Sequence, residues 1–126
     1  MFVGRRQDER IQSVHQERSK KSIDYAISII KESRIFPFVD KLLLYGSCAR
    51  QDQRYDSDVD LFLVLKPNID LDVYRDDLIR LKGDVSPVDF DLPEVDLHST
   101  VGNVWETSNM LYYQNVKRDG IEIYKN

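Results

Sequence analysis

Two short apolar runs, joined by a polar segment, limit the fold of this chain more than any other feature. The first run, Leu42–Tyr45, ends at Gly46, and a run of this length bounded by glycine indicates a buried strand. The second run, Val59–Leu65, is followed closely by Pro67, which a continuing strand does not tolerate. The sequence therefore predicts two strands connected through a small-residue turn and the polar residues 47–57.

Asp58 and Asp60 stand at the start of the second predicted strand. Because side chains alternate between the two faces of a strand, these acids share one face with Phe62 and Val64. Their backbone positions are then roughly 7 Å apart. Neighbouring carboxylates repel each other, and a divalent cation such as Mg²⁺ removes that repulsion. A pair of acids kept at a strand edge for solubility is the alternative interpretation.

Apolar residues at helical spacing predict helices on both sides of these strands. The first helix is expected over residues 22–34, before Pro37. A second is expected over residues 71–81, with Gly83 as its C-cap, and a third after Gly102, ending at Gly120. The segment "IEIY" is expected to form a short last strand or tail. This order predicts one α+β domain, with a mixed sheet flanked by helices.

A third strand is predicted over Val88–Leu92, where apolar and acidic residues alternate. Asp89 and Asp91 would share one face of this strand. Asp89 lies early in the strand and is the predicted third acid of the site. Asp91 is its main rival, and Asp96, expected in the following loop, is a more distant alternative.

The turn at Gly46 and Ser47 supplies candidate phosphate contacts. A small residue lets the backbone approach a phosphate, and the N–H groups and the Ser hydroxyl can donate to its oxygens. Arg50, and with less weight Arg54, would add charge-assisted hydrogen bonds to a triphosphate. A surface ion pair is the alternative for Arg50. Acids that hold metal beside a turn that holds phosphate are typical of nucleotidyl transfer.

The composition fits one soluble domain in a reducing compartment. The chain has 126 residues, of which 41% are hydrophobic and 32% charged, and its net charge of −4 argues against binding to duplex DNA. It has no apolar run of membrane-spanning length and no signal-peptide core near its N-terminus, so a cytoplasmic location is expected. The single Cys48 excludes an intrachain disulfide and is expected to be a bystander. His98 is expected in a solvated loop, and a zinc site is not expected.

The chain divides into two predicted parts. Residues 1–21 are polar and rich in Lys and Arg, which predicts an extension that is helical or frayed, with a partner-binding arm as the alternative. Residues 22–126 form the predicted catalytic domain.

Residues 46–60 match the pattern G-S-x(10)-D-x-D. The stretch "YGSCARQDQRYDSDVDLFLVL" resembles the signature of the minimal nucleotidyltransferase (MNT) group of the DNA polymerase beta-like nucleotidyltransferase superfamily. "VDFDL" resembles the strand that carries the third acid in that group, and "LYYQNVKRDGIEIY" resembles its closing helix and tail. The resemblance covers about residues 22–126. Cys48 stands where Arg is frequent in the group, which puts one phosphate contact in question.

The resemblance implies a polymerase beta-like fold that uses two Mg²⁺ ions and ATP as substrate. It implies two sets of site residues: Gly46, Ser47, Arg50 and Ser57 at the nucleotide, and Asp58, Asp60 and Asp89 as catalytic metal ligands. It also implies a HEPN-domain toxin as partner in a hetero-oligomer, with AMP transferred to a tyrosine of that toxin by this chain as antitoxin. The alternative is a catalytically silent antitoxin that neutralises its partner by binding alone.

Overall fold

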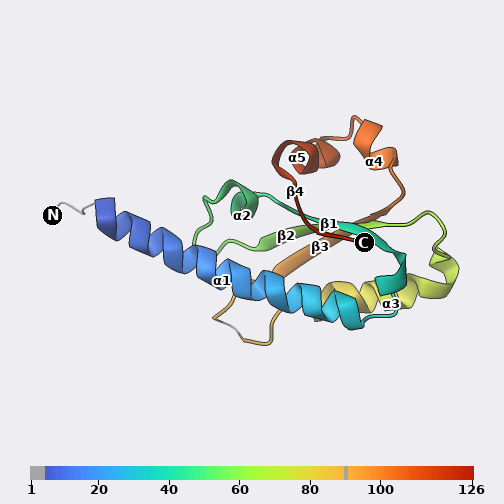
Figure 1. The fold of residues 1–126 in the computed structure, drawn as a ribbon, viewed down its shortest axis with the longest axis horizontal. Helices are drawn as coiled ribbons and strands as arrows, with labels where there is room; N and C mark the ends of the chain where they lie inside the picture. Colours follow the sequence, from blue (N-terminus) through green and yellow to red (C-terminus); the bar gives the residue numbers. More distant parts are fainter. Residues whose placement is uncertain (1–4, 90) are drawn as a thin grey trace.

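A four-stranded mixed sheet forms the centre of the molecule (Figure 1). The computed structural model describes residues 5–89 and 91–126. Its strands follow the spatial order β3-β2-β1-β4, with β1 antiparallel to β2 and β4 and β2 parallel to β3. The strand bounds are β1 (Val39–Tyr45), β2 (Val59–Leu65), β3 (Val95–Val101) and β4 (Ile121–Lys125). The predicted α+β class with a mixed sheet is confirmed.

Helices cover both faces of this sheet, with α1 and α3 on one side and α4 and α5 on the other (Figure 1). The predicted boundary between residues 21 and 22 falls inside α1, and residues 1–4 of the predicted extension lie outside the described residues. None of the helices within residues 5–89 and 91–126 is long and apolar enough to cross a membrane. The helix bounds are α1 (Arg5–Glu32), η1 (Phe36–Phe38), α2 (Ser47–Arg50), α3 (Leu71–Asp84), α4 (Val104–Thr107) and α5 (Leu111–Asp119).

Strand β2 separates two apolar clusters, one on each face of the sheet. Its Phe62 and Val64 side chains pack with Trp105 of α4 and Val116 of α5; we call this side the α5 face. The side opposite, the α1/α3 face, is filled by the alternate residues of β2, namely Val59, Leu61, Leu63 and Leu65. The two faces predicted from the sequence are therefore confirmed.

The prediction of a third strand over Val88–Leu92 is wrong for the described residues of that segment, which lie in the loop between α3 and β3. The Asp89 carboxylate accepts a hydrogen bond from the backbone N–H of Asp91 (Oδ1···N 2.9 Å), a local contact that competes with a strand ladder. Pro87 and Pro93 bracket the segment and have no N–H to offer a ladder. The third strand forms instead at Val95–Val101.

Two helix predictions also need correction. Helix α3 runs through Gly83 to Asp84, and its C-cap is Val85. The predicted third helix is broken at residues 108–110 into α4 and α5. Lys117 Nζ donates to Ser108 O (2.8 Å) and so satisfies a carbonyl at the break.

Candidate active site at the start of strands β2 and β3

The sheet register brings acidic residues together at one end of β2 and β3. Asp60 pairs with Tyr45 of β1 on one side and with Asp96 of β3 on the other. Neighbouring strands lie roughly 4.8 Å apart, and paired residues of parallel strands point to the same face. Asp60 and Asp96 are therefore neighbours on the α5 face, and Asp58 directly precedes the strand.

The half-buried Asp60 carboxyl lies at the centre of this acidic group. Burial raises its pKa, the charges of Asp96 and Asp58 raise it further, and His98 and Arg50 act in the opposite direction. Carboxylates that raise one another's pKa are stabilised by a cation placed between them. The charges of the site thus favour a divalent metal ion.

The acids do not by themselves make a complete set of metal ligands. Among the described residues, no group of three or more His, Cys, Asp or Glu side chains is placed so that it could hold a metal ion. Mg²⁺ is commonly held by one or two carboxylates, with waters and substrate phosphates completing its octahedron. An ion beside Asp60 would therefore need a nucleotide and water to supply most of its ligands.

Gly46, in the turn predicted to bind phosphate, lies close to the Asp60 carboxylate. Its φ of 74° lies in the left-handed region, which favours glycine. A Cβ at this position would collide with Oδ2 of Asp60. The left-handed backbone favours glycine here, and any larger residue would also require the Asp60 carboxylate to move. Ser47 begins α2 immediately afterwards.

Asp89 does not take the place expected for the third acid. It is exposed in the loop before β3, whereas Asp96 stands on the strand next to Asp60. A sequence signal for this strand does exist, because Val95 and Leu97 alternate with Asp96 directly after Pro93. Residues 88–91 show the same alternation of apolar and polar residues, so the sequence alone did not distinguish the two segments.

Two other predicted nucleotide contacts have partners within the chain. Arg50 Nη1 lies 2.8 Å from Asp119 Oδ2, and its Nε lies 3.2 Å from Asp52 Oδ2. Ser57 Oγ accepts from the backbone N–H of Arg54 (2.9 Å) and so stabilises the turn before β2. The contacts of Arg50 and Ser57 with a nucleotide remain predictions.

Sequence reasoning missed a group of ring side chains beside the acids. His98 lies on β3 and not in a loop; its Nε2 is 3.2 Å from Asp96 Oδ2, and its ring centroid is 5.0 Å from that of Tyr112. The hydroxyl oxygens of Tyr112 and Tyr45 are 3.0 Å apart. Burial raises the pKa of both phenols, so both are neutral donors at physiological pH. If a strand is assumed to begin at Val95, the alternation of its side chains puts His98 on the same face as Asp96.

Cys48 packs under α1, and its Sγ also lies 3.7 Å from the backbone carbonyl oxygen of Asp58. It is buried, and its Sγ lies 3.5 Å from Ser19 Oγ. Burial raises the pKa of its thiol, which keeps it protonated and unreactive. A packing role agrees with the bystander role predicted for this residue.

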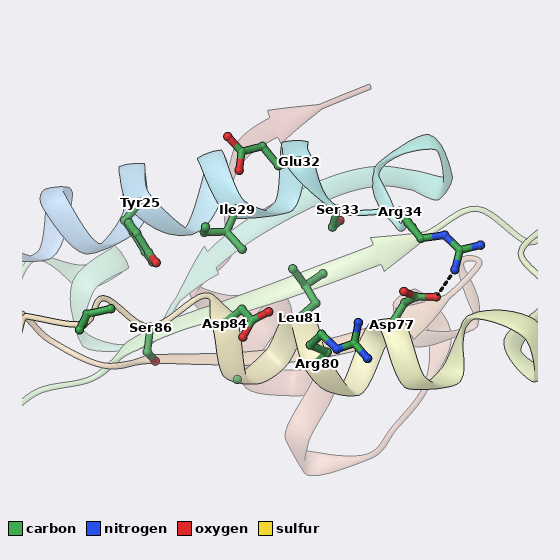
Figure 2. Close-up of a pocket in the computed structure, with 12 residues that line it drawn as sticks. Tyr25, Ile29, Glu32, Ser33, Arg34, Asp77, Arg80, Leu81, Asp84 and Ser86 are labelled. Carbon is green, nitrogen blue, oxygen red and sulfur yellow. Dashed lines mark hydrogen bonds and ion pairs between the residues drawn. The ribbon is translucent and has the colours of Figure 1, made fainter.

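A groove between α1 and α3 lies apart from the acids. It has a volume of about 540 Å³ and is lined by residues that include Tyr25, Ile29 and Leu81 (Figure 2). The Arg34–Asp77 ion pair (3.2 Å) crosses it. None of the acids at the start of β2 and β3 lines this groove. We therefore place the candidate site at the acids, where Gly46 and the charges of Asp58 and Asp96 lie close to Asp60.

Comparison with known proteins identifies the family. The profile of the family "Polymerase beta, Nucleotidyltransferase" matches residues 24–126, and the chain belongs to this family. No curated protein matches the chain.

Two solved structures share the fold. A candidate nucleotidyltransferase from Sulfolobus solfataricus is 19% identical, with a TM-score of 0.53 over 100% of this chain and 93% of that chain. A toxin–antitoxin structure with AMP-PNP is 17% identical, with a TM-score of 0.51 over 82% of this chain and 73% of that chain. At these identities the similarity shows a shared fold, and the family match over residues 24–126 shows that this is the polymerase beta-like nucleotidyltransferase fold.

Proposed function

We propose that this chain is a Mg²⁺-dependent nucleotidyltransferase that transfers AMP from ATP to a hydroxyl group. The observation that carries the proposal is the convergence of Asp58, Asp60 and Asp96 beside Gly46. The register of β2 with β3 and the clash expected of a Cβ at Gly46 both support this grouping. Family membership supports the class of reaction.

In this proposal the acids hold two metal ions and the turn holds the triphosphate. Asp58 and Asp60 would hold the metal ions together with the nucleotide, and Asp96 would take the place of the third acid that the sequence assigned to Asp89. Bound Mg²⁺ would neutralise charge on the triphosphate and on the departing pyrophosphate. Ser47 and the N–H groups after Gly46 donate to phosphate oxygens.

The transfer step needs one proton acceptor from the chain. The acceptor hydroxyl oxygen forms a bond to the α-phosphorus, the bond from that phosphorus to the bridging oxygen breaks, and pyrophosphate leaves. The hydroxyl proton passes to the Asp96 carboxylate as general base. Arg50 and Ser57 remain the proposed further nucleotide contacts, and Arg50 would have to exchange or share its partners Asp52 and Asp119 to reach a phosphate.

We further propose that the acceptor is a tyrosine of a HEPN-domain toxin, and that this chain acts as its antitoxin in a hetero-oligomer. The resemblance of residues 46–60 to the MNT signature supports this partner. The toxin–antitoxin structure with AMP-PNP supports it as a protein of the same fold. An antitoxin that acts by binding alone is the second candidate. It is supported by the finding that no three described His, Cys, Asp or Glu side chains are placed to hold a metal ion.

The test incubates the purified chain with Mg²⁺, ATP labelled on the α-phosphate, and the protein encoded by the neighbouring gene. Labelling of that protein is expected. The double variant Asp58→Asn with Asp60→Asn should abolish the label, whereas Asp56→Asn, an exposed acid of the same loop, should leave it unchanged. Persistent labelling by the double variant contradicts the proposal. A tight complex without label supports the binding-only antitoxin.

A further inference from the structure

The N-terminal half of α1, residues 10–22, lies before the matched family region and still contacts the loops that lead into the acid site. One of these loops connects α2 to β2 and ends at Asp58. The other connects α3 to β3 and ends just before Asp96. The helix therefore lies against both segments that set where the acids stand.

Arg18 bridges these two loops with a single guanidinium group. Its Nη1 donates to the carbonyl of Tyr55 (3.1 Å), and its Nε donates to the carbonyl of Asp91 (2.9 Å). Its Nη2 also donates to Asp91 O. The guanidinium carbon lies 4.0 Å from the centroid of the Tyr55 ring. Because the guanidinium fork is planar and rigid, it fixes the distance between the two carbonyls.

Neighbouring residues of the same helix add contacts to each loop separately. Gln12 Nε2 donates to Gln51 O (3.0 Å) and lies 3.2 Å from Gln53 Oε1. Gln53 Nε2 in turn donates to Ser19 Oγ (3.4 Å).

On the other loop, buried Ser22 donates through Oγ to Pro93 O (2.7 Å). A further direct link is the hydrogen bond from the N–H of Val59, the first residue of β2, to Glu94 O (2.9 Å). Among these contacts, Arg18 is the side chain that touches both loops.

We propose that Arg18 is a positioning residue for the nucleotidyl-transfer site. Tyr55 stands three positions before Asp58, and Asp91 stands five positions before Asp96. The guanidinium therefore ties together the approaches to the two strands that carry the metal-binding acids. It acts through the backbone of both loops and does not touch the substrate. This role rests on the proposed function, and it gives the N-terminal half of α1 a part in the activity.

The test compares Arg18→Met and Arg18→Lys with Lys21→Met, all in the full chain and at a temperature where each variant is folded. Lys21 is exposed on the same helix, and its side chain takes part in none of the hydrogen bonds or ion pairs found within residues 5–89 and 91–126. The Lys variant keeps the charge but loses the fork. We expect both Arg18 variants to need about 10-fold more Mg²⁺ for half-maximal transfer, and Lys21→Met to match the wild type.

Amide hydrogen exchange tests the bridge without relying on activity. In both Arg18 variants, residues 53–57 and 91–94 should exchange faster together, while the centre of β2 keeps its protection. An unchanged Mg²⁺ requirement in Arg18→Met overturns the proposal. Faster exchange in one loop alone, or equally throughout the sheet, also overturns it. If the wild-type chain transfers no nucleotide to any acceptor, the proposed function fails, and the exchange data alone decide whether Arg18 couples the loops.

Discussion

The two faces of strand β2 differ in what they do, although their residues alternate along one short segment. On the α1/α3 face, Leu61 and Leu63 are fully buried between the sheet and two helices. On the α5 face, Phe62 is fully buried too, but Asp60 near the start of the strand is half-buried among other charges. The pKa of Asp60 is raised because its ionised form is poorly solvated there.

This difference shows how one strand separates stability from chemistry. Apolar residues on both faces anchor the strand, and burial of each such side chain stabilises the fold by about 1.5–3 kcal/mol. These apolar residues fix the position of the strand and thereby the position of Asp60 near its start. Changes at neighbouring positions of β2 should therefore have effects of different kinds.

The largest effect is expected from the third acid. Asp96→Asn should lower the rate of nucleotidyl transfer on the order of 100- to 1000-fold, because it removes a proposed metal ligand and the proton acceptor. Asp89→Asn should leave the rate within about twofold of the wild type. Initial rates of transfer at saturating ATP, measured for both variants, show which of the two acids the reaction needs. A severe loss of activity in Asp89→Asn, with normal activity in Asp96→Asn, would show that Asp89 is the third acid.

A core substitution on the opposite face should affect stability instead. Leu61→Ala removes a side chain that is 0% exposed and should lower the free energy of unfolding by about 2–5 kcal/mol. The rate per folded molecule should change little. Chemical denaturation measures the first quantity, and active-site-normalised rates measure the second. A full loss of activity in folded Leu61→Ala would show that the two faces are not separable.

Two glycine substitutions should have effects of opposite sign. Gly46→Ala meets both a positive φ and the Asp60 carboxylate, and should destabilise the chain by about 1–3 kcal/mol and disrupt the acids. Gly83→Ala lies inside α3, where a Cβ has nothing within 4 Å, and should stabilise it by about 0.5–1 kcal/mol. Thermal unfolding of both variants measures this contrast. A neutral Gly46→Ala would remove the argument for close approach of the turn to Asp60.

The smallest effect concerns pH and is measured without Mg²⁺. Because the pKa of Asp60 is raised above its ordinary value of 3.8 in the folded chain, folding disfavours its ionised form. The stability contributed by Asp60 is fully present below pH 3.8 and is lost as the pH rises through the folded value. Asp60→Asn should therefore unfold at a higher temperature than the wild type at neutral pH, with the advantage vanishing in acid. Added Mg²⁺ and ATP should stabilise only the wild type.

Local patterns predicted much of this architecture. The alternation in Val59–Leu65 fixes both faces of β2, because side-chain direction in a strand depends only on position along it. The spacing of Gly46 and Ser47 from Asp58 and Asp60 lies within one short segment, so it is readable without knowing the fold.

The features that were missed depend on pairing between distant residues. Residues 88–91 and 95–98 show the same alternation of apolar and polar residues, and only pairing with β2 shows which of them forms the strand. Asp89 and Asp96 therefore look equivalent until register is known. The contacts of Arg18 join residues that are 37 and 73 positions apart in the chain, and no local pattern records them.

The most direct test of the central claim is a crystal structure of the chain with Mn²⁺ and AMP-PNP, in which anomalous scattering locates the metal. Mn²⁺ takes oxygen ligands in octahedral geometry, as Mg²⁺ does. We expect anomalous peaks at metal ions bound by the carboxylates of Asp58, Asp60 and Asp96, with the phosphates against Gly46 and Ser47. A peak bound by Asp89, or a nucleotide seated away from the start of β2, would contradict the central claim.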